Sequence, residues 1–393
     1  MALDASASLD LVALAPRLRG VIQARAETAL ERLRRWVELE SPSDDKAALD
    51  FCGRAIAADF AAAHARLAIH PQAQAGDHLE LTLAPGREKG PGLLLLGHFD
   101  TVYPLGTLAA MPFRAAGGRI EGPGVLDMKG GISVVYEAWV ALRHFGLEPR
   151  RPVTLLLVSD EETGSATARP LIERLARDAA AVLVLEPGAG AEGRLKTARK
   201  GIAHFTVRAE GIAAHAGVDF EQGASALLEL ARQTVAWAGL TDLERGVTVN
   251  PGVLRGGTRS NVVAASAELE LDVRAWRDQD LREVVARIQS SRPHDPRVKL
   301  AVSGGINRPP MEPTPAAAAL FERACGIGRA LGLALAAAAT GGGSDGNFTA
   351  ALGVPTLDGL GPAGGGAHSP GEYCTEDSLV SRAALLALLL LAL

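Results

Sequence analysis

The chain has 393 residues, more than one hydrophobic core usually serves, so two domains are the first expectation. It is 48% hydrophobic and 22% charged with a formal net charge of −5, and no basic block stands out, which argues against a nucleic-acid partner. Its three cysteines, Cys52, Cys325 and Cys374, form no CxxC pair, which argues against a disulfide framework and against a zinc-thiolate site.

The two ends of the sequence argue against export and against a membrane span. The first stretch, MALDASASLDLVALAPRLRG, carries acids early and has no basic n-region, unlike a secretory signal. The last stretch, AALLALLLLAL, is shorter than the roughly 20 apolar residues that cross a bilayer, and it predicts a final helix packed into the core. We therefore expect a cytoplasmic protein of enzyme size with no membrane partner.

The first part of the chain alternates helical and strand-like segments. Residues 20–38 have helical periodicity, and Ser43 and Asp44 are N-cap candidates for a second helix. Because the strand-like runs are apolar on both faces, the pattern predicts an α/β domain whose mixed, largely parallel sheet is flanked by helices. The predicted elements are strands at 65–70, 79–83, 93–97, 152–160 and 180–188, a helix after Gly130-Gly131 to about 145 and a helix near 168–177.

The pattern changes near residue 200. The stretch GIAHFTVRAEG (201–211) alternates apolar and polar residues, as a strand with one buried face does. The order that follows is β-α-β-β-α-β, which predicts an inserted ferredoxin-like α+β domain. Its further elements are a helix at 222–239, strands at 246–255 and 260–275, a helix at 279–291 and a strand at 297–303. We predict an α/β domain in two parts, 1–199 and 309–393, interrupted by an inserted α+β domain at 200–308.

Polar side chains gather where the buried strands end. His98 and Asp100 follow the apolar run of PGLLLLGHFDTV, Glu161 and Glu162 follow VTLLLVSD, and Glu186 follows AAVLVL. Ligands of α/β sheets collect at the carboxyl ends of the strands. Each stretch alone fits an ordinary role, such as a surface histidine or a solvated pair of glutamates.

Two loops add further candidates. Asp127 lies in GPGVLDMKGG, where an aspartate is also a common N-cap, and His368 lies in GGGAHSPGEY. Together the five stretches offer nitrogen and oxygen ligands without thiolate, which suit zinc, with cobalt or manganese as substitutes. Their presence in order and in matching contexts favours a metal site over five unrelated structural roles.

The stretches GHFDTV, GPGVLDMKGG, SDEETGS, LEPG and AHSPGEY resemble the five metal-site stretches of the M20 family of zinc peptidases and deacylases, especially its glutamate carboxypeptidase branch. The resemblance implies two zinc ions per subunit. His98 and Glu186 would bind one zinc ion, Glu162 and His368 the other, and Asp127 would bridge both.

The same resemblance implies the catalytic roles of two acids in these stretches. Asp100 would fix the tautomer of the His98 ring. Glu161 would be the general base that takes the proton of the attacking water and delivers it to the leaving amine.

The resemblance makes 1–199 and 309–393 the two parts of a catalytic zinc domain and 200–308 a lid or dimerisation domain. It also gives roles to residues of this inserted domain. His215, in EGIAAHAGV, would reach across a dimer interface and stabilise the oxyanion, although an exposed loop histidine is an equal alternative. Arg274 with Asn261 would bind the free carboxylate of the substrate, unless Arg274 only pairs with an acid of its own strand.

The Gly-rich loop TGGGSDGN would bring the backbone of Gly342 and Gly343 near the substrate, and it lacks the pattern of a phosphate loop. Whether Arg199, Lys200 or Arg308 contacts substrate stays open.

The leading hypothesis is a dizinc hydrolase of the glutamate carboxypeptidase type, which cleaves the amide bond of a small peptide or N-acyl amino acid with a free carboxylate, as a homodimer. The alternatives are an N-acyl amino acid deacylase or desuccinylase of the same family, or a non-catalytic binding paralogue, against which the intact ligand set argues. Few aromatic residues, 4%, leave no stacking platform for a pterin-like group. No GxGxxG follows an early strand, which argues against a nucleotide or redox enzyme.

Overall fold

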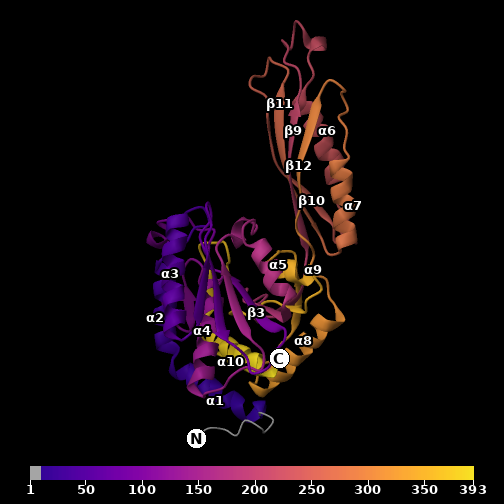
Figure 1. The fold of residues 1–393 in the computed structure, drawn as a ribbon. Helices are drawn as coiled ribbons and strands as arrows, with labels where there is room; N and C mark the ends of the chain where they lie inside the picture. Colours follow the sequence, from indigo (N-terminus) through magenta and orange to yellow (C-terminus); the bar gives the residue numbers. More distant parts are fainter. Residues whose placement is uncertain (1–9) are drawn as a thin grey trace. The chain divides into compact units, whose positions relative to one another are not determined.

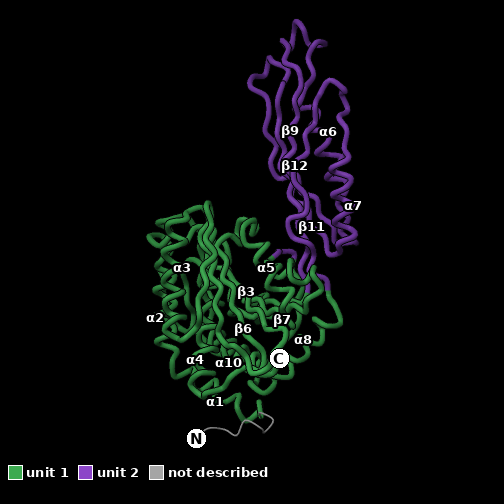
Figure 2. The backbone as a smooth tube through the Cα atoms, in the orientation of Figure 1, with its two compact units in different colours: residues 1–197, 313–340, 344–393 green, residues 198–312, 341–343 purple. Residues whose placement is uncertain are grey.

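The computed structural model describes residues 10–393, which form two compact units (Figure 2). Of the described residues, the first unit comprises 10–197, 313–340 and 344–393, and the second comprises 198–312 and 341–343. Nine residues of the N-terminal stretch that we interpreted as lacking a secretory signal lie outside the described part. The predicted insertion, 200–308, falls within the second unit, and its role as a lid or dimerisation domain stays a prediction.

The first unit contains a six-stranded sheet in the order β1-β2-β6-β3-β7-β14 (Figure 1). Strands β6, β3, β7 and β14 run parallel, whereas β1 and β2 pair antiparallel at one edge. The six strands are β1 (Arg66–His70), β2 (His78–Ala84), β3 (Gly92–His98), β6 (Val153–Val158), β7 (Ala179–Val184) and β14 (Thr356–Leu357). The predicted mixed, largely parallel sheet is confirmed.

Helices cover both faces of this sheet, as the doubly apolar strands require. Leu93 and Leu95 of β3 belong to a core shared with α1, α3, α4, α8 and α10, while Leu94 and Leu96 belong to a second core shared with α5 and α9. The helices of this unit are α1 (Leu11–Ala24), α2 (Ala26–Glu38), α3 (Lys46–Ala62), α4 (Lys129–His144), α5 (Arg169–Arg177), α8 (Pro315–Ala330), α9 (Gly346–Ala351) and α10 (Glu376–Ala392). The C-terminal apolar run is the buried helix α10, as predicted.

Short strands complete the first unit. A four-stranded sheet has the order β15-β16-β5-β4, and β8 pairs with β13. Their bounds are β4 (Arg114–Ala116), β5 (Arg119–Glu121), β8 (Leu195–Arg199), β13 (Ala337–Thr340), β15 (Gly364–Gly365) and β16 (Tyr373–Thr375). Over residues 10–393, none of the helices has both the length and the apolar character that a membrane crossing demands.

The second unit has the predicted β-α-β-β-α-β order. Its antiparallel sheet has the strand order β10-β11-β9-β12, and residues of α6 and α7 share one apolar core with the sheet. The elements are β9 (Gly201–Glu210), α6 (Ala226–Ala238), β10 (Thr248–Gly256), β11 (Ser266–Ala275), α7 (Asp278–Gln289) and β12 (Lys299–Arg308). Alternate residues of β9, such as Phe205 and Val207, are buried, as the alternation of the sequence predicted.

Two local predictions are wrong. The predicted single helix over 20–38 is two helices, because Arg25 leaves the helical conformation and its Nε donates to a carboxylate oxygen of Glu137 on α4 at 2.7 Å. The N-cap of α3 is Asp45 and neither Ser43 nor Asp44, since the Asp45 carboxylate accepts from the Ala48 amide at 3.0 Å.

Candidate active site

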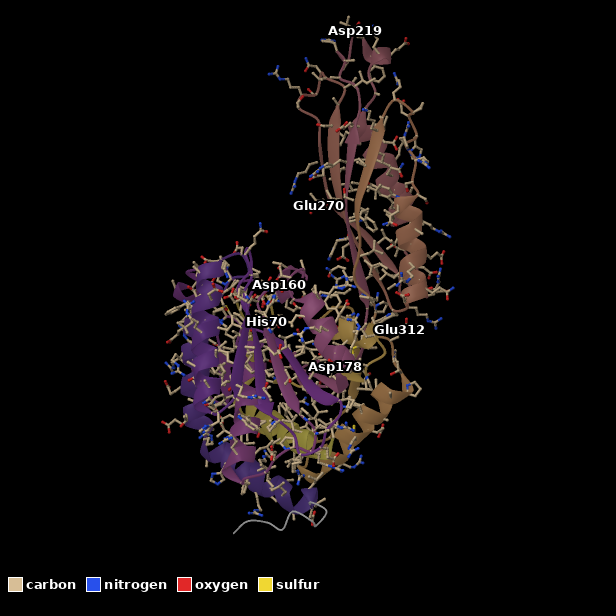
Figure 3. The ribbon with its side chains drawn as sticks, viewed as in Figure 1. His70, Asp160, Asp178, Asp219, Glu270 and Glu312 are labelled. Carbon is tan, nitrogen blue, oxygen red and sulfur yellow. The ribbon has the colours of Figure 1, made fainter. Side chains whose placement is uncertain are left out.

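Three parallel strands of the first unit end at the same edge of the sheet and deliver the predicted acids and histidine there. His98 is the last residue of β3, and Glu186 follows β7 by two residues. Asp160 comes after β6 and caps the 3₁₀ turn Glu161–Thr163 (Figure 3). The parallel registers of β3 with β6 and β7 bring these exits together, as the carboxyl ends of neighbouring strands do.

The carboxylate of Asp127 lies between two histidines. One of its oxygens is 3.2 Å from Nε2 of His98, and the other is 3.4 Å from Nε2 of His368. A glutamate accompanies each ring, Glu186 at 3.6 Å from His98 Nε2 and Glu162 at 3.1 Å from His368 Nε2. The structure therefore brings the five predicted metal ligands together as two pairs that share Asp127. Their action as ligands stays a prediction.

Two overlapping groups of side chains at this site have the spacing of metal ligands. One ligand atom each of His98, Asp127 and Glu162 lies within 4.8 Å of the others, and the same holds for His98, Glu161 and Glu186. Imidazole nitrogen and carboxylate oxygen are donors that zinc and related divalent ions accept. The carboxylate of Glu161, predicted as the general base, thus lies beside the ligand set.

The electrostatics of His98 show a site that attracts positive charge. Burial alone lowers the pKa of His98, but hydrogen bonds to Asp100, Asp127 and Glu186 outweigh it and hold this pKa well above its usual value. The ring is 1% exposed, so the surrounding carboxylates act on it with little screening by water.

The other half of the cluster behaves in the same way. Hydrogen bonds to Asp127 and Glu162 raise the pKa of His368 to about 10. Burial raises the pKa of Glu162, whereas the pKa of Asp127 is lowered because the two histidines outweigh the effect of its burial. The carboxylates thus favour the protonated form of both histidine rings. Bound cations would supply the same positive charge to the cluster. The donor set fits a divalent metal centre.

Asp100 is fully buried and contacts both the His98 ring and the turn that carries Glu161 and Glu162. Its Oδ1 lies 3.3 Å from His98 Nδ1, and its two oxygens accept from the amides of Glu161 at 3.3 Å and Glu162 at 3.1 Å. The hydroxyl of Ser43 donates to Oδ2 at 2.8 Å. Sequence reasoning gave Asp100 only the histidine and missed that it also holds the turn of both glutamates.

Glu372 is a second buried carboxylate that the sequence analysis did not single out. Its oxygens accept from the amides of Gly124, Leu126 and Asp127 and from the Tyr103 hydroxyl, at 2.7–3.2 Å. Burial raises the pKa of Glu372 in spite of these bonds. Glu372 therefore fixes the loop that presents the Asp127 carboxylate. The available signal was its place in the AHSPGEY stretch, four residues after His368.

The predicted substrate-binding residues lie in the second unit. His215 pairs with Val262 in a β-bridge, and the amide of Ala216 donates to the backbone carbonyl of Asn261 at 3.0 Å, so the structure places His215 and Asn261 in adjoining loop segments. Both lie beyond the Ser266 end of β11, whereas Arg274 lies near its other end. Within one chain the structure therefore does not bring Asn261 and Arg274 together, as the sequence analysis expected. The His215 Nδ1 accepts from the Gly217 amide at 3.1 Å.

Arg274 pairs with an acid of its own strand, the alternative that the sequence left open. Its Nε and Nη2 donate to the two oxygens of Asp272 at 2.9 and 3.1 Å, and Nη1 donates to the Gly341 carbonyl at 2.9 Å. Arg199, only 2% exposed, donates to the carbonyls of Gly342 and Gly343. The glycine loop therefore turns carbonyls, and not only amides, toward charged side chains.

Lys200 and Arg308 have different surroundings. The Lys200 ammonium lies 5.4 Å from the centre of the Trp276 ring, whereas Arg308 is 4% exposed and lies against Gly343.

A histidine–carboxylate centre at the strand ends of an α/β unit is an arrangement that hydrolases with divalent metal ions use. Residues 94–392 match peptidase family M20/M25/M40. Carboxypeptidase G2 from Pseudomonas sp. (strain RS-16) is 33% identical over 305 residues, 76% of this chain and 73% of that protein. The chain belongs to peptidase family M20/M25/M40, so the family inferred from the five stretches is confirmed, and the protein is a hydrolase.

Solved structures show the same fold. The aminopeptidase PepT from Bacillus cereus ATCC 10987 has a TM-score of 0.75 at 21% identity, covering 92% of this chain and 98% of that one. The M20 family metallo-carboxypeptidase Sso-CP2 from Sulfolobus solfataricus has a TM-score of 0.69 at 15% identity, covering 92% and 98%. At these identities the two structures support the fold alone.

Proposed function

We propose that the protein is a dizinc carboxypeptidase-like hydrolase that removes an amino acid with a free carboxylate from a small peptide or an N-acyl group. The observation that carries this proposal is the Asp127 carboxylate, which has one oxygen near His98 and the other near His368, while each ring also has a glutamate beside it, Glu186 at His98 and Glu162 at His368. Such a shared carboxylate suits two cations a few ångström apart. The 33% identity to a carboxypeptidase supports the reaction class.

The residues around this centre would divide the work. Two zinc ions, or cobalt or manganese in their place, would acidify a water and polarise the scissile carbonyl. Glu161 would accept the proton of the attacking water and return it to the leaving amine. Asp100 would hold the His98 ring and, through the two amides that it accepts, the position of Glu161.

The substrate carboxylate would bind Arg274 and the backbone of Gly342 and Gly343. Asn261 lies beside His215 beyond the other end of β11, so it would reach this carboxylate only from the partner subunit. A guanidinium has five N–H donors, and Arg274 uses three of them on Asp272 and Gly341, so two remain for a carboxylate. Asp272 would then orient the guanidinium and need not release it. This leaves room for substrate binding in spite of the ion pair on the strand.

We further propose a homodimer formed through the second unit, in which His215 stabilises the oxyanion in the partner's site. A His215→Ala chain mixed with a Glu161→Gln chain would then recover activity, because one site of the mixed dimer has both residues. If verified subunit exchange gives no recovery, His215 does not act across subunits.

A panel of substrates tests the proposed reaction. Dipeptides and N-acyl amino acids that vary in the acyl group and in the C-terminal residue would be assayed with zinc, cobalt and manganese separately, each beside its α-amide. The proposal expects cleavage of free acids and a strong preference over the amides. Preference for short N-acyl groups over dipeptides would instead identify a deacylase or desuccinylase, and no cleavage by the metal-loaded protein would favour a binding paralogue.

A further inference from the structure

A separate cavity of about 250 Å³ lies inside the first unit, between α1, α2, α4, β5 and α10. Its walls are mostly apolar and share no residue with the metal cluster; they include Ile22, Leu30, Ile120, Leu379 and Val380. A dry cavity of about 150 Å³ already binds benzene, so this one has room for a ring and a short side arm.

A buried hydroxyl faces this cavity. Ser133 of α4 is 2% exposed and lines the cavity. A serine hydroxyl can both donate and accept a hydrogen bond. The wall therefore carries one small polar group at a mostly apolar site.

The three glutamates that line the cavity differ in their ion pairs. Glu137 is neutralised, because both Arg25 and Arg32 form ion pairs with its carboxylate. Glu27 and Glu376 also line the cavity, each in the first turn of its helix and exposed, and within the described chain neither forms an ion pair. The lining thus presents two exposed carboxylates without an ion-pair partner beside a mostly apolar interior.

We propose that this cavity binds a small aralkylamine, with its ring between the apolar walls and its ammonium group at Glu27 and Glu376. The apolar volume selects the ring, and the two free carboxylates select a cation over a neutral or anionic group. The site is independent of the peptidase reaction. It touches α4, which begins two residues after Asp127, so an occupant would contact the helix behind the metal-binding loop.

Three probes of one shape test the proposal on the full-length, metal-loaded protein: 2-phenylethylamine, 2-phenylethanol and 3-phenylpropanoate. We expect the amine to bind in isothermal titration with a Kd of about 10 μM to 10 mM, the range of fragment-sized ligands. The alcohol should bind more weakly, and the anion should not bind. No binding of the amine, or equal binding of all three probes, would overturn the proposal.

Two variants localise the binding. Ala29→Leu adds bulk to the cavity wall and should abolish binding while the melting temperature shows that the protein is still folded. Glu27→Gln with Glu376→Gln should weaken the amine about two- to five-fold for each carboxylate and leave the alcohol unchanged. Undiminished amine binding in folded Ala29→Leu protein would place the ligand elsewhere and refute the assignment.

Discussion

The substitution Asp100→Asn removes a charge that holds two parts of the metal site at once. Asp100 Oδ1 faces His98 Nδ1 and the Glu161 amide, and Oδ2 faces the Glu162 amide and the Ser43 hydroxyl. An asparagine offers an oxygen on one side only. Its NH₂ group would take the place of Oδ2, because the Ser43 hydroxyl can rotate and accept a hydrogen bond from it. In that position the NH₂ group points a donor at the Glu162 N–H, which is also a donor, so this hydrogen bond is lost.

The expected cost follows from these contacts. One hydrogen bond to a charged acceptor is lost in a site with no exposed surface, which is worth about 1.5–3 kcal/mol. Loss of a group that orients metal ligands typically lowers metal affinity or activity about 10- to 100-fold. We therefore expect Asp100→Asn to lower both zinc affinity and kcat/KM within that range, measured by chelator competition and by hydrolysis of the best substrate.

Ser43→Ala is the matched control. It removes the hydroxyl that donates to Asp100 at 2.8 Å and leaves the charge and both amides in place, so it should cost about 1.5–3 kcal/mol of stability but lower zinc affinity and kcat/KM less than Asp100→Asn does. If Asp100→Asn keeps the zinc affinity and turnover of the unsubstituted protein within two-fold, Asp100 does not hold the ligands and the turn as described.

Three further predictions concern the base, the substrate and the second unit. Glu161→Gln should keep its metal and lose about 10²- to 10⁴-fold in kcat, whereas Glu162→Gln should lose metal; identical behaviour would refute the division of roles. Arg274→Ala should lose the preference for a free acid over its α-amide, at a cost of about 2–5 kcal/mol in kcat/KM, and an unchanged ratio would exclude Arg274 as the anchor. Burial raises the pKa of Glu229, but hydrogen bonds from His294 and neighbouring groups outweigh it and lower this pKa. The ionised carboxylate of Glu229 therefore stabilises the folded protein fully above the unfolded pKa of about 4.3. This stabilisation is lost as the pH falls through the lower folded pKa. Glu229→Gln should therefore unfold at a lower temperature than the unsubstituted protein at pH 7, with a difference that shrinks below about pH 4.

The sequence predicts that the candidate metal ligands lie together, because most of them directly follow strand ends. Each buried strand is a continuous apolar run, so its end is visible, and parallel strands bring their ends to one edge. His98, Glu162 and Glu186 are placed by this rule alone. Asp127 and His368 lie in loops, and only the resemblance to a family assigned them to the same site.

The groups that hold the cluster could not be predicted in this way. Glu372 contacts amides about 250 residues earlier in the chain, and Ser43 meets Asp100 across 57 positions, distances for which no periodicity gives a signal. The break at Arg25 has the same origin, since the helical pattern continues through it and the partner Glu137 lies far along the chain. By contrast, Arg274 and Asp272 are two residues apart on one strand, so alternation places them on one face and made their pairing foreseeable.

The shared position of Asp127 between two histidine–glutamate pairs is tested most directly by counting metal ions in active protein. Metal analysis of the purified enzyme, beside turnover during stepwise chelation and zinc return, should give about two divalent ions per chain and activity that falls and recovers with them. The variant His368→Ala should retain about one ion, because His98 and Glu186 remain. Full turnover by protein with no bound metal would contradict the account.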